Sequence, residues 1–220
     1  MKKLSPSLIC MDLCNLEREI QRLESLGITL LHIDVIDGIY SPDMPLGIET
    51  VKQLRQRTNL EFDVHLMSVH NEPYVDLLLD VGVQRLCFQT EYEKRPTILL
   101  RKIRSKGVKA GIALAPETPL CAVKEILPLC DFVLIMRIDA GYAHLPGQNV
   151  YPSADQKVSE LRKYATEQGL NIEIEIDGRV DKECMEKLSC ANIFVSGSRG
   201  LFFKDRTWEE NWEILKEVLQ

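Results

Sequence analysis

The chain has 220 residues, of which 45% are hydrophobic and 27% charged, and its formal net charge is -6 at pH 7. This length accommodates one sizeable domain and is too short for two, so we expect residues 1–220 to form a single domain. The acidic balance argues against nonspecific nucleic-acid binding, which needs a dense basic surface, but allows a local cationic pocket for an anionic small molecule. Since no apolar run approaches the ~18–20 residues of a membrane span, and no signal-peptide core is visible, we expect no membrane association.

Short β-branched runs alternate with longer amphipathic segments along the whole chain. The expected strands are residues 4–9, 29–34, 61–66, 84–88, 108–113, 131–136, 172–177 and 192–196. Helical patterns lie between them, for example at 15–26, 95–106 and 154–168. Several strands are continuously apolar, as is typical of parallel strands covered by helices. Eight such units predict an α/β fold, a single (β/α)8 TIM barrel, and the alternative is a doubly wound open sheet.

The final helix is predicted from two separate signals. Thr207 and Glu210 form a T-x-x-E capping box, which marks a helix N-terminus. After the capping threonine, apolar residues recur at helical spacing and should pack on the barrel. They are Trp208, Trp212, Leu215 and Leu219.

The seven cysteines favour a reducing compartment. Their number is odd, no Cys-x-x-Cys pair occurs, and most of their neighbours are apolar. This pattern is typical of free thiols rather than of a disulfide framework or a cysteine metal site. We therefore expect a cytoplasmic protein.

Two histidines and two aspartates fall where active sites of such barrels lie, at the C-terminal ends of the strands. His32 and Asp34 are two residues apart on the second strand and so face the same side. His65 ends the third strand, and Asp177 ends the seventh, across the barrel mouth. A lone histidine at a strand end usually makes a packing hydrogen bond, but this set of two imidazoles and two carboxylates suits a divalent Zn, Mn, Fe or Co ion.

These segments resemble the ribulose-phosphate 3-epimerase family, and the matches run in order over nearly the whole chain. They are Ser5-Pro6-Ser7, 32–38 (HIDVIDG), 63–67 (DVHLM), 116–119 (PETP), 134–136 (LIM), 175–178 (EIDG) and Gly197-Ser198. The start at 7–13 (SLICMDL) and the ending Gly200-Leu201-Phe202 look closer to the allulose-6-phosphate 3-epimerase branch. The resemblance implies a barrel of the phosphate-barrel (ribulose-phosphate-binding) type.

The resemblance also implies a reaction. Such enzymes remove the proton at C3 of a ketose phosphate and return it from the opposite face, so Asp34 and Asp177 are expected to be the two bases. One divalent metal ion, held by the same aspartates with His32 and His65, would bind the C2 and C3 oxygens and stabilise the enediolate. Family members commonly assemble into dimers or hexamers, so a homo-oligomer is expected.

The resemblance places a further set of residues at the substrate. Ser7, Met67 and Met136 match substrate-cavity positions, although both methionines could equally be core filler. Gly178, Gly197 and Ser198 fall where the family holds the substrate phosphate.

The chain departs from the family at this phosphate end. The family's glycine-rich loop after strand six is replaced by a longer segment within 139–152 that lacks a Gly-Gly pair, which would permit close backbone approach. Arg137, Arg179 and Arg199 follow strands six, seven and eight in turn. Our hypothesis is that the guanidinium groups of these arginines partly replace backbone donors in binding the substrate phosphate. The alternative is that one or more of the three arginines point to solvent.

Two other departures from the family pattern, and the alternative functions, concern the reaction chemistry. Ile36 stands where the family usually has Met, and Gln89 where it usually has His. The Asp-x-Lys-x-x-Asp signature of related decarboxylases is absent at 34–37, and no strand-end lysine suits a Schiff-base aldolase. The remaining alternatives are an altered barrel acting as a sugar-phosphate-binding or scaffold protein, and an epimerase of another anionic ketose.

Overall fold

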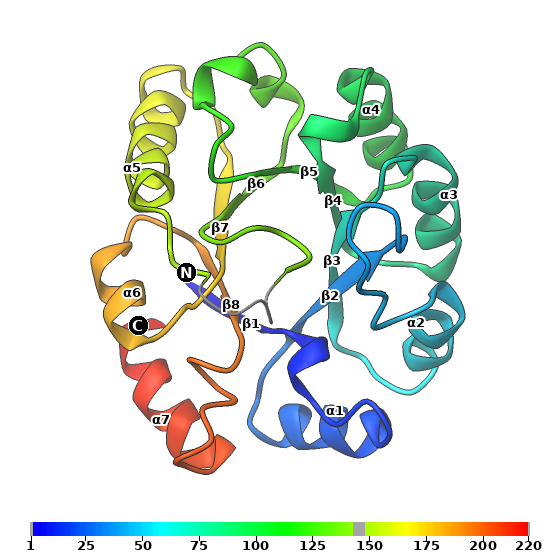
Figure 1. Ribbon diagram of the computed structural model, residues 1–220, viewed down its shortest axis with the longest axis vertical. Helices are drawn as coiled ribbons and strands as arrows, with labels where there is room; N and C mark the ends of the chain where they lie inside the picture. Colours follow the sequence, from blue (N-terminus) through cyan, green and yellow to red (C-terminus); the bar gives the residue numbers. More distant parts are fainter. Residues whose placement is uncertain (1, 143–147, 220) are drawn as a thin grey trace.

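The computed structural model describes residues 2–142 and 148–219 and contains eight parallel strands arranged as a barrel (Figure 1). The strands are β1 (Lys3–Pro6), β2 (Leu30–Ile36), β3 (Glu61–Met67), β4 (Arg85–Gln89), β5 (Lys109–Leu114), β6 (Phe132–Met136), β7 (Glu173–Asp177) and β8 (Ile193–Ser196). Their order is β1-β8-β7-β6-β5-β4-β3-β2, and a single parallel bridge between Ser7 and His32 joins the two ends. The barrel prediction is therefore confirmed, and the open doubly wound sheet is wrong.

Helices surround the strands as an outer ring (Figure 1). The α-helices are α1 (Leu16–Ser25), α2 (Ile48–Arg55), α3 (Asn71–Val81), α4 (Pro96–Ser105), α5 (Pro152–Glu167), α6 (Lys182–Lys187) and α7 (Trp208–Leu219). Among the described residues no helix is long and apolar enough to span a bilayer.

The expectation of eight complete β-then-α units is wrong at the fifth. Between β5 and β6 the chain forms only two 3-10 turns, η3 (Leu120–Ala122) and η4 (Leu127–Leu129), in place of an α-helix. Pro116, Pro119 and Pro128 lie in this connection, and a proline inside a helix removes a backbone donor and clashes with the preceding turn.

The first strand is also shorter than expected. β1 ends at Pro6, and the 3-10 turn η1 (Leu8–Cys10) replaces the predicted strand up to residue 9. Backbone amides of Cys10 and Met11 bond back to the carbonyls of Ser7 and Leu8, so the chain turns at the barrel mouth. The other strands begin and end within two residues of the expected positions.

The last helix follows its prediction closely. Thr207 N donates to Glu210 Oε2 over 2.8 Å, and Glu210 N donates back to Thr207 Oγ1 over 3.2 Å, which completes the capping box. Leu215 is buried, and the two tryptophans with Leu219 pack against the core as half-buried side chains.

Because side chains alternate along each strand, one set packs against the helices and the other points into the barrel. On β3, for example, Phe62, Val64 and Leu66 face the helices and belong to the large apolar core. The intervening Asp63, His65 and Met67 belong to the inner side of the barrel. This inner side therefore mixes a small apolar cluster with buried charges, and the charges lie on the strands that carry the predicted site.

Candidate metal centre and active-site cavity

Four side chains from three strands come together at one end of the barrel. His32 and Asp34 come from β2, His65 from β3 and Asp177 from the last position of β7. Strand register sets Asp34 directly beside His65. One potential ligand atom of each residue lies within 4.8 Å of the other three. The structure thus brings together all four residues that the sequence predicted as metal ligands.

The ligand atoms of this cluster fit a cation. His32 Nε2 is buried, has no hydrogen-bond partner among the described residues, and lies 3.4 Å from Asp34 Oδ1. His65 Nδ1 lies 3.3 Å from the same carboxylate oxygen. Two imidazole nitrogens converging on shared carboxylates form a mixed nitrogen and oxygen donor set, which suits a divalent transition metal.

The two aspartates differ electrostatically. Burial acts to raise the pKa of Asp34, but the charges and hydrogen bonds of His32 and His65 outweigh it and lower that pKa. Burial, and then the charge of Asp34, raise the pKa of Asp177. Burial acts to lower the pKa of His32, but its carboxylate neighbours, Asp34 foremost, raise it well above the ordinary value. The carboxylates therefore favour positive charge at His32, in a site with little solvent.

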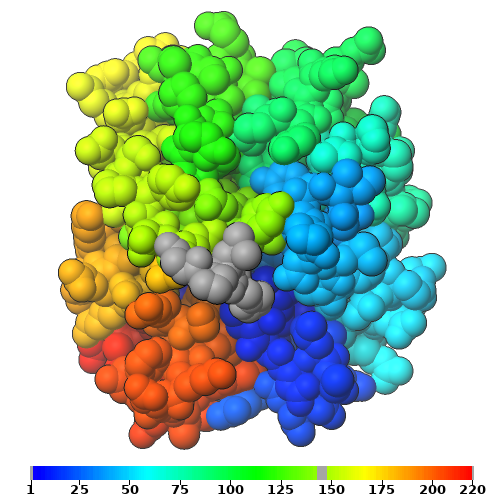
Figure 2. All heavy atoms as spheres, in the orientation of Figure 1, coloured from blue at the N-terminus to red at the C-terminus, as the bar shows by residue number. Residues whose placement is uncertain are grey.

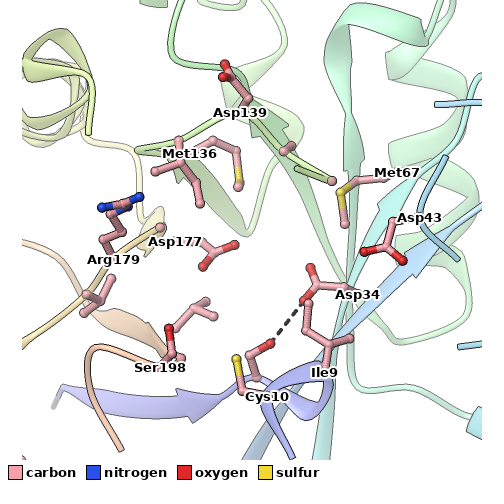
Figure 3. Close-up of a pocket in the computed structure, with 18 of the residues that line it drawn as sticks. Ile9, Cys10, Asp34, Asp43, Met67, Met136, Asp139, Asp177, Arg179 and Ser198 are labelled. Carbon is pink, nitrogen blue, oxygen red and sulfur yellow. Dashed lines mark hydrogen bonds between the residues drawn. The ribbon is translucent and has the colours of Figure 1, made fainter. Parts of the chain in front are cut away.

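A cavity of about 200 Å³ opens over these carboxylates. Asp34 and Asp177 project into it from β2 and β7 and point toward one another (Figure 3). Ser7 Oγ donates a hydrogen bond of 3.2 Å to Asp34 Oδ2, which fixes one aspartate at the wall (dashed line in Figure 3). His32 and His65 lie beneath, only 1% and 0% exposed, so the aspartates rather than the histidines face the contents of the cavity.

All eight residues predicted to contact substrate line this cavity. They are Ser7, Met67, Met136, Gly178, Arg179, Gly197, Ser198 and Arg199. On the face shown in Figure 2, segments near residues 10, 40, 140 and 200 lie side by side around the centre. The cavity is thus bounded by loops that follow β1, β2, β6, β7 and β8.

Arg179 has an unusual backbone conformation for its residue type. It is the one non-glycine with positive φ in the described part of the chain, at φ 51°, and it follows Gly178 at φ 106°. A Cβ at Gly178 would come within 2.8 Å of the Ile138 side chain, so that glycine allows the two loops to touch. A strained residue that persists at a cavity wall is typical of a functional position.

Arg137 does not line the cavity, which corrects the idea that all three arginines do. It is 6% exposed, and its Nε donates to Asp155 Oδ1 over 2.8 Å. Its Nη1 donates to the carbonyls of Gly178 and Arg179 over 2.9 and 3.1 Å. Because these partners already occupy the guanidinium, Arg137 supports the loop that carries Arg179 rather than reaching the cavity.

The altered segment after β6 is described only in part. Asp139, Ala140 and Gly141 line the cavity, and Gln148 Nε2 donates to the carbonyl of Asp139 over 3.2 Å. Residues 143–147, which include His144, lie outside the described residues.

Two groups of residues at or below the site were not predicted from the sequence. Cys10 from η1 lines the cavity, and burial, followed by the charges of Asp34 and Asp177, raises the pKa of its thiol to about 11. Beneath the site, Asp63, Arg85 and Glu175 are buried inside the barrel. The sequence did contain a signal for the last three residues, because each is a charged residue in a buried strand. Two of them also precede a predicted metal ligand by two positions.

Comparison with known proteins identifies the family. Residues 3–202 match the ribulose-phosphate 3 epimerase family. The chain belongs to this family. Ribulose-phosphate 3-epimerase from Treponema pallidum is 36% identical over 197 residues, which are 89% of each chain. The enzyme of that name from Bacillus subtilis is 33% identical over 201 residues, 90% of this chain and 91% of the relative. The closer likeness to an allulose-6-phosphate branch stays a prediction.

Solved structures show the same fold at low identity. 3-Keto-L-gulonate-6-phosphate decarboxylase from Vibrio cholerae has a TM-score of 0.71 at 12% identity, covering 99% of this chain and 97% of its own. 3-Hexulose-6-phosphate synthase from Salmonella typhimurium has a TM-score of 0.68 at 12% identity, with 99% and 98% covered. At these identities the likeness shows the barrel and says nothing about the reaction.

Proposed function

We propose that this protein is a metal-dependent 3-epimerase of a ketose phosphate, an isomerase acting on carbohydrates. The observation that carries the proposal is the pair of carboxylates, Asp34 and Asp177, which face each other across one cavity above two buried histidines. Inverting a carbon centre by proton transfer needs one acid or base on each side of the substrate. Membership of the ribulose-phosphate 3 epimerase family supports the same chemistry.

In the proposed mechanism one carboxyl group takes up the C3 proton, and the other, which starts protonated, gives a different proton to the opposite face. Asp34 removes the C3 proton from one face, and Asp177 delivers a proton to the other face; the roles exchange for the reverse reaction. Ser7, which bonds Asp34 Oδ2, orients that carboxylate toward the substrate. When bound, a divalent ion on the four ligands supplies Lewis acidity that stabilises negative charge developing on the substrate oxygens.

The substrate phosphate is proposed to lie at the wall formed by the β7 and β8 loops. Gly178, Gly197 and Ser198 offer backbone donors there, and Arg179 and Arg199 line the same wall. Guanidinium groups bind phosphate through charge-assisted hydrogen bonds, so they compensate for the missing Gly-Gly loop. Both pentulose 5-phosphates and hexulose 6-phosphates fit this description of the substrate.

Several properties remain part of the proposal only. The ion is Zn, Fe, Mn or Co, since all suit this donor set. A cytoplasmic location, assembly into dimers or hexamers, a single domain over 1–220 and the absence of nucleic-acid binding also stay predictions.

The direct test is a screen of ketose 5- and 6-phosphates for C3 epimerisation in deuterium oxide, with NMR detection of deuterium at C3. We expect at least one substrate to take up deuterium and to yield both epimers, and metal analysis to find a bound divalent ion. Metal-loaded protein that exchanges no C3 proton in any of these substrates would contradict the proposal. Tight sugar-phosphate binding in that case would favour the binding-protein alternative.

A further inference from the structure

Below the four proposed ligands, the barrel interior holds three charged side chains that the mechanism above does not use. Asp63 lies on β3, Arg85 on β4 and Glu175 on β7, and they are 1%, 3% and 0% exposed. Burying an ionised group is costly unless it is paired and hydrogen-bonded. Such a set inside a small barrel therefore calls for a function.

Strand pairing places this set next to one proposed metal ligand, His32. His32 on β2 is the register partner of Asp63 on β3, and Asp63 is the register partner of Arg85 on β4. Side chains that are register partners on one face of a sheet lie next to each other. The three residues thus form a row across the inner wall, one layer below Asp34 and His65.

The contacts in this row define which nitrogen of His32 carries hydrogen. His32 Nδ1 lies 3.3 Å from Asp63 Oδ2 and 3.4 Å from Glu175 Oε1, and both oxygens are carboxylate acceptors. Nδ1 therefore donates its hydrogen downward to Asp63. The opposite nitrogen, Nε2, is the atom that faces Asp34 and has no hydrogen bond among the described residues. A neutral imidazole held in this way presents a lone pair to a metal.

Arg85 fixes both carboxylates from the other side. Its Nε donates to Asp63 Oδ1 and its Nη2 to Glu175 Oε2, each over 2.9 Å. Ser5 Oγ donates a further bond of 3.0 Å to Asp63 Oδ2. Because each oxygen of Asp63 has a donor, the carboxylate cannot rotate without losing a buried bond.

Packing in turn fixes Arg85. Its guanidinium stacks 4.0 Å from the centre of the Phe132 ring. A Cβ at Gly111 would come within 2.6 Å of that ring, so the absence of a side chain at Gly111 leaves the room that Phe132 fills. The position of the guanidinium therefore follows from β4, β5 and β6 together.

This cluster is unsuited to a second cation. His32, Asp63 and Glu175 also offer three ligand atoms within 4.8 Å of one another. The guanidinium of Arg85, however, already supplies the positive charge next to both carboxylates, and a metal ion there would be repelled by it.

We propose that Asp63, held by Arg85 and Ser5, is a positioning residue that orients His32 and fixes its tautomer, so that Nε2 binds the metal. The inference rests on the metal centre of the proposed function. It adds that metal affinity depends on a hydrogen-bonded row below the site.

Asp63→Asn gives a sharp test, because the amide has a defined orientation. Arg85 Nε holds the amide oxygen, so the NH2 group faces His32 Nδ1 and Ser5. A donor in that place favours the other tautomer, with hydrogen on Nε2, the atom that should bind metal. Outer partners of ligating histidines typically contribute about 10- to 100-fold to metal affinity, and we expect a loss in that range.

The readouts are the dissociation constant for Zn²⁺, measured by competition with a chromogenic chelator, and the visible spectrum of the Co²⁺-loaded protein. Glu61→Gln is the matched control, because it makes the same change on the same strand in an exposed ion pair with Lys3. It should leave both readouts unchanged. Arg85→Lys keeps the charge but replaces the planar fork, whose Nε and Nη2 bond different carboxylates, with a single nitrogen. It should weaken Zn²⁺ binding several-fold, which provides the test if Asp63→Asn does not fold.

The outcomes separate this inference from the proposed function. Wild-type protein that binds neither Zn²⁺ nor Co²⁺ would overturn the metal centre itself. Wild-type binding that folded Asp63→Asn or folded Arg85→Lys retains, with the same dissociation constant and the same Co²⁺ spectrum, would overturn the positioning role alone. Weaker binding and a shifted spectrum in these variants, with Glu61→Gln unchanged, would support it.

Discussion

The floor and the rim of the cavity are built in different ways. The floor, defined as His32, Asp34, His65 and Asp177, lies on strands, and both histidines are almost fully buried with identified partners. The rim, defined as Arg179, Ser198, Arg199 and the segment 139–142, lies on loops, and Ser198 and Arg199 are exposed. Groups on packed strands hold a fixed geometry, whereas loops vary without disturbing the barrel.

This difference suggests that reaction type and substrate choice are encoded separately. The proposed bases and metal ligands keep the family pattern, and the departures at Arg179, Arg199 and the segment after β6 lie at the rim, whereas Gln89 departs from it beside His65. We therefore expect floor substitutions to change the chemical step or metal affinity, and rim substitutions to change substrate binding. Variants of the floor and of the rim test this division.

The largest effect is expected at the floor, for Asp177→Asn. Removing a positioned acid or base costs about 10²–10⁴-fold in rate, so kcat for epimerisation should fall in that range. Since Asp34 remains, the variant should still exchange the C3 hydrogen of one epimer with solvent while failing to invert it. Comparison of C3 deuterium uptake by the two epimers measures this. Equal exchange from both epimers at the wild-type rate would exclude Asp177 as a base.

The next effect concerns Gln89, which contacts His65 of the floor and stands where the family usually has histidine. Gln89 Nε2 lies 3.1 Å from His65 Nε2, while Gln89 Oε1 has no hydrogen-bond partner in the described ranges 2–142 and 148–219. A half-turn of the amide exchanges its nitrogen and oxygen, and in that orientation Gln89 Oε1 accepts the hydrogen on His65 Nε2 and leaves Nδ1, next to Asp34, free for metal. Gln89→Leu removes this acceptor, and we expect Zn²⁺ affinity to fall about 10-fold or more.

Gln89→Glu is the matched control for that experiment. It keeps an acceptor oxygen of the same reach, so chelator competition should find Zn²⁺ affinity at or above the wild-type value. If the leucine and glutamate variants bind Zn²⁺ equally, Gln89 does not orient His65.

At the rim, Arg199→Ala should raise KM for a phosphorylated ketose with little change in kcat. Loss of one charge-assisted hydrogen bond to phosphate corresponds to about a 10-fold change. Arg206→Ala is the control, since Arg206 is exposed on the same connection and stacks on Phe203 outside the cavity wall. A kcat loss in Arg199→Ala as large as that of Asp177→Asn would break the division between floor and rim.

The contrast also explains what sequence could and could not predict. Strand periodicity and the position of strand ends placed the barrel and all four floor residues, because alternation and parallel register follow directly from local pattern. The missing fifth α-helix was signalled by three prolines. The roles of the arginines were not readable, because a loop residue's direction depends on partners such as Asp155, which holds Arg137 away from the cavity. Asp63, Arg85 and Glu175 could be recognised in the sequence as charged residues in strands. That Arg85 bonds both carboxylates could not, because it depends on how β3, β4 and β7 face one another in the folded barrel.

The smallest effect is expected for Arg179→Gly, and it should have opposite signs in stability and binding. Arg179 holds a left-handed φ of 51°, which costs an L-residue about 1 kcal/mol or more and costs glycine almost nothing. Glycine also loses more backbone freedom on folding, so we expect the free energy of unfolding to rise by no more than about 1 kcal/mol. KM for the phosphorylated substrate should rise at the same time, because the guanidinium at the cavity wall is gone.

Arg179→Ala separates the two effects: it should raise KM equally but gain no stability, since alanine keeps the strain. Denaturant unfolding and steady-state kinetics measure both quantities, and a glycine variant that is more stable with unchanged KM would mean that Arg179 does not bind the anion.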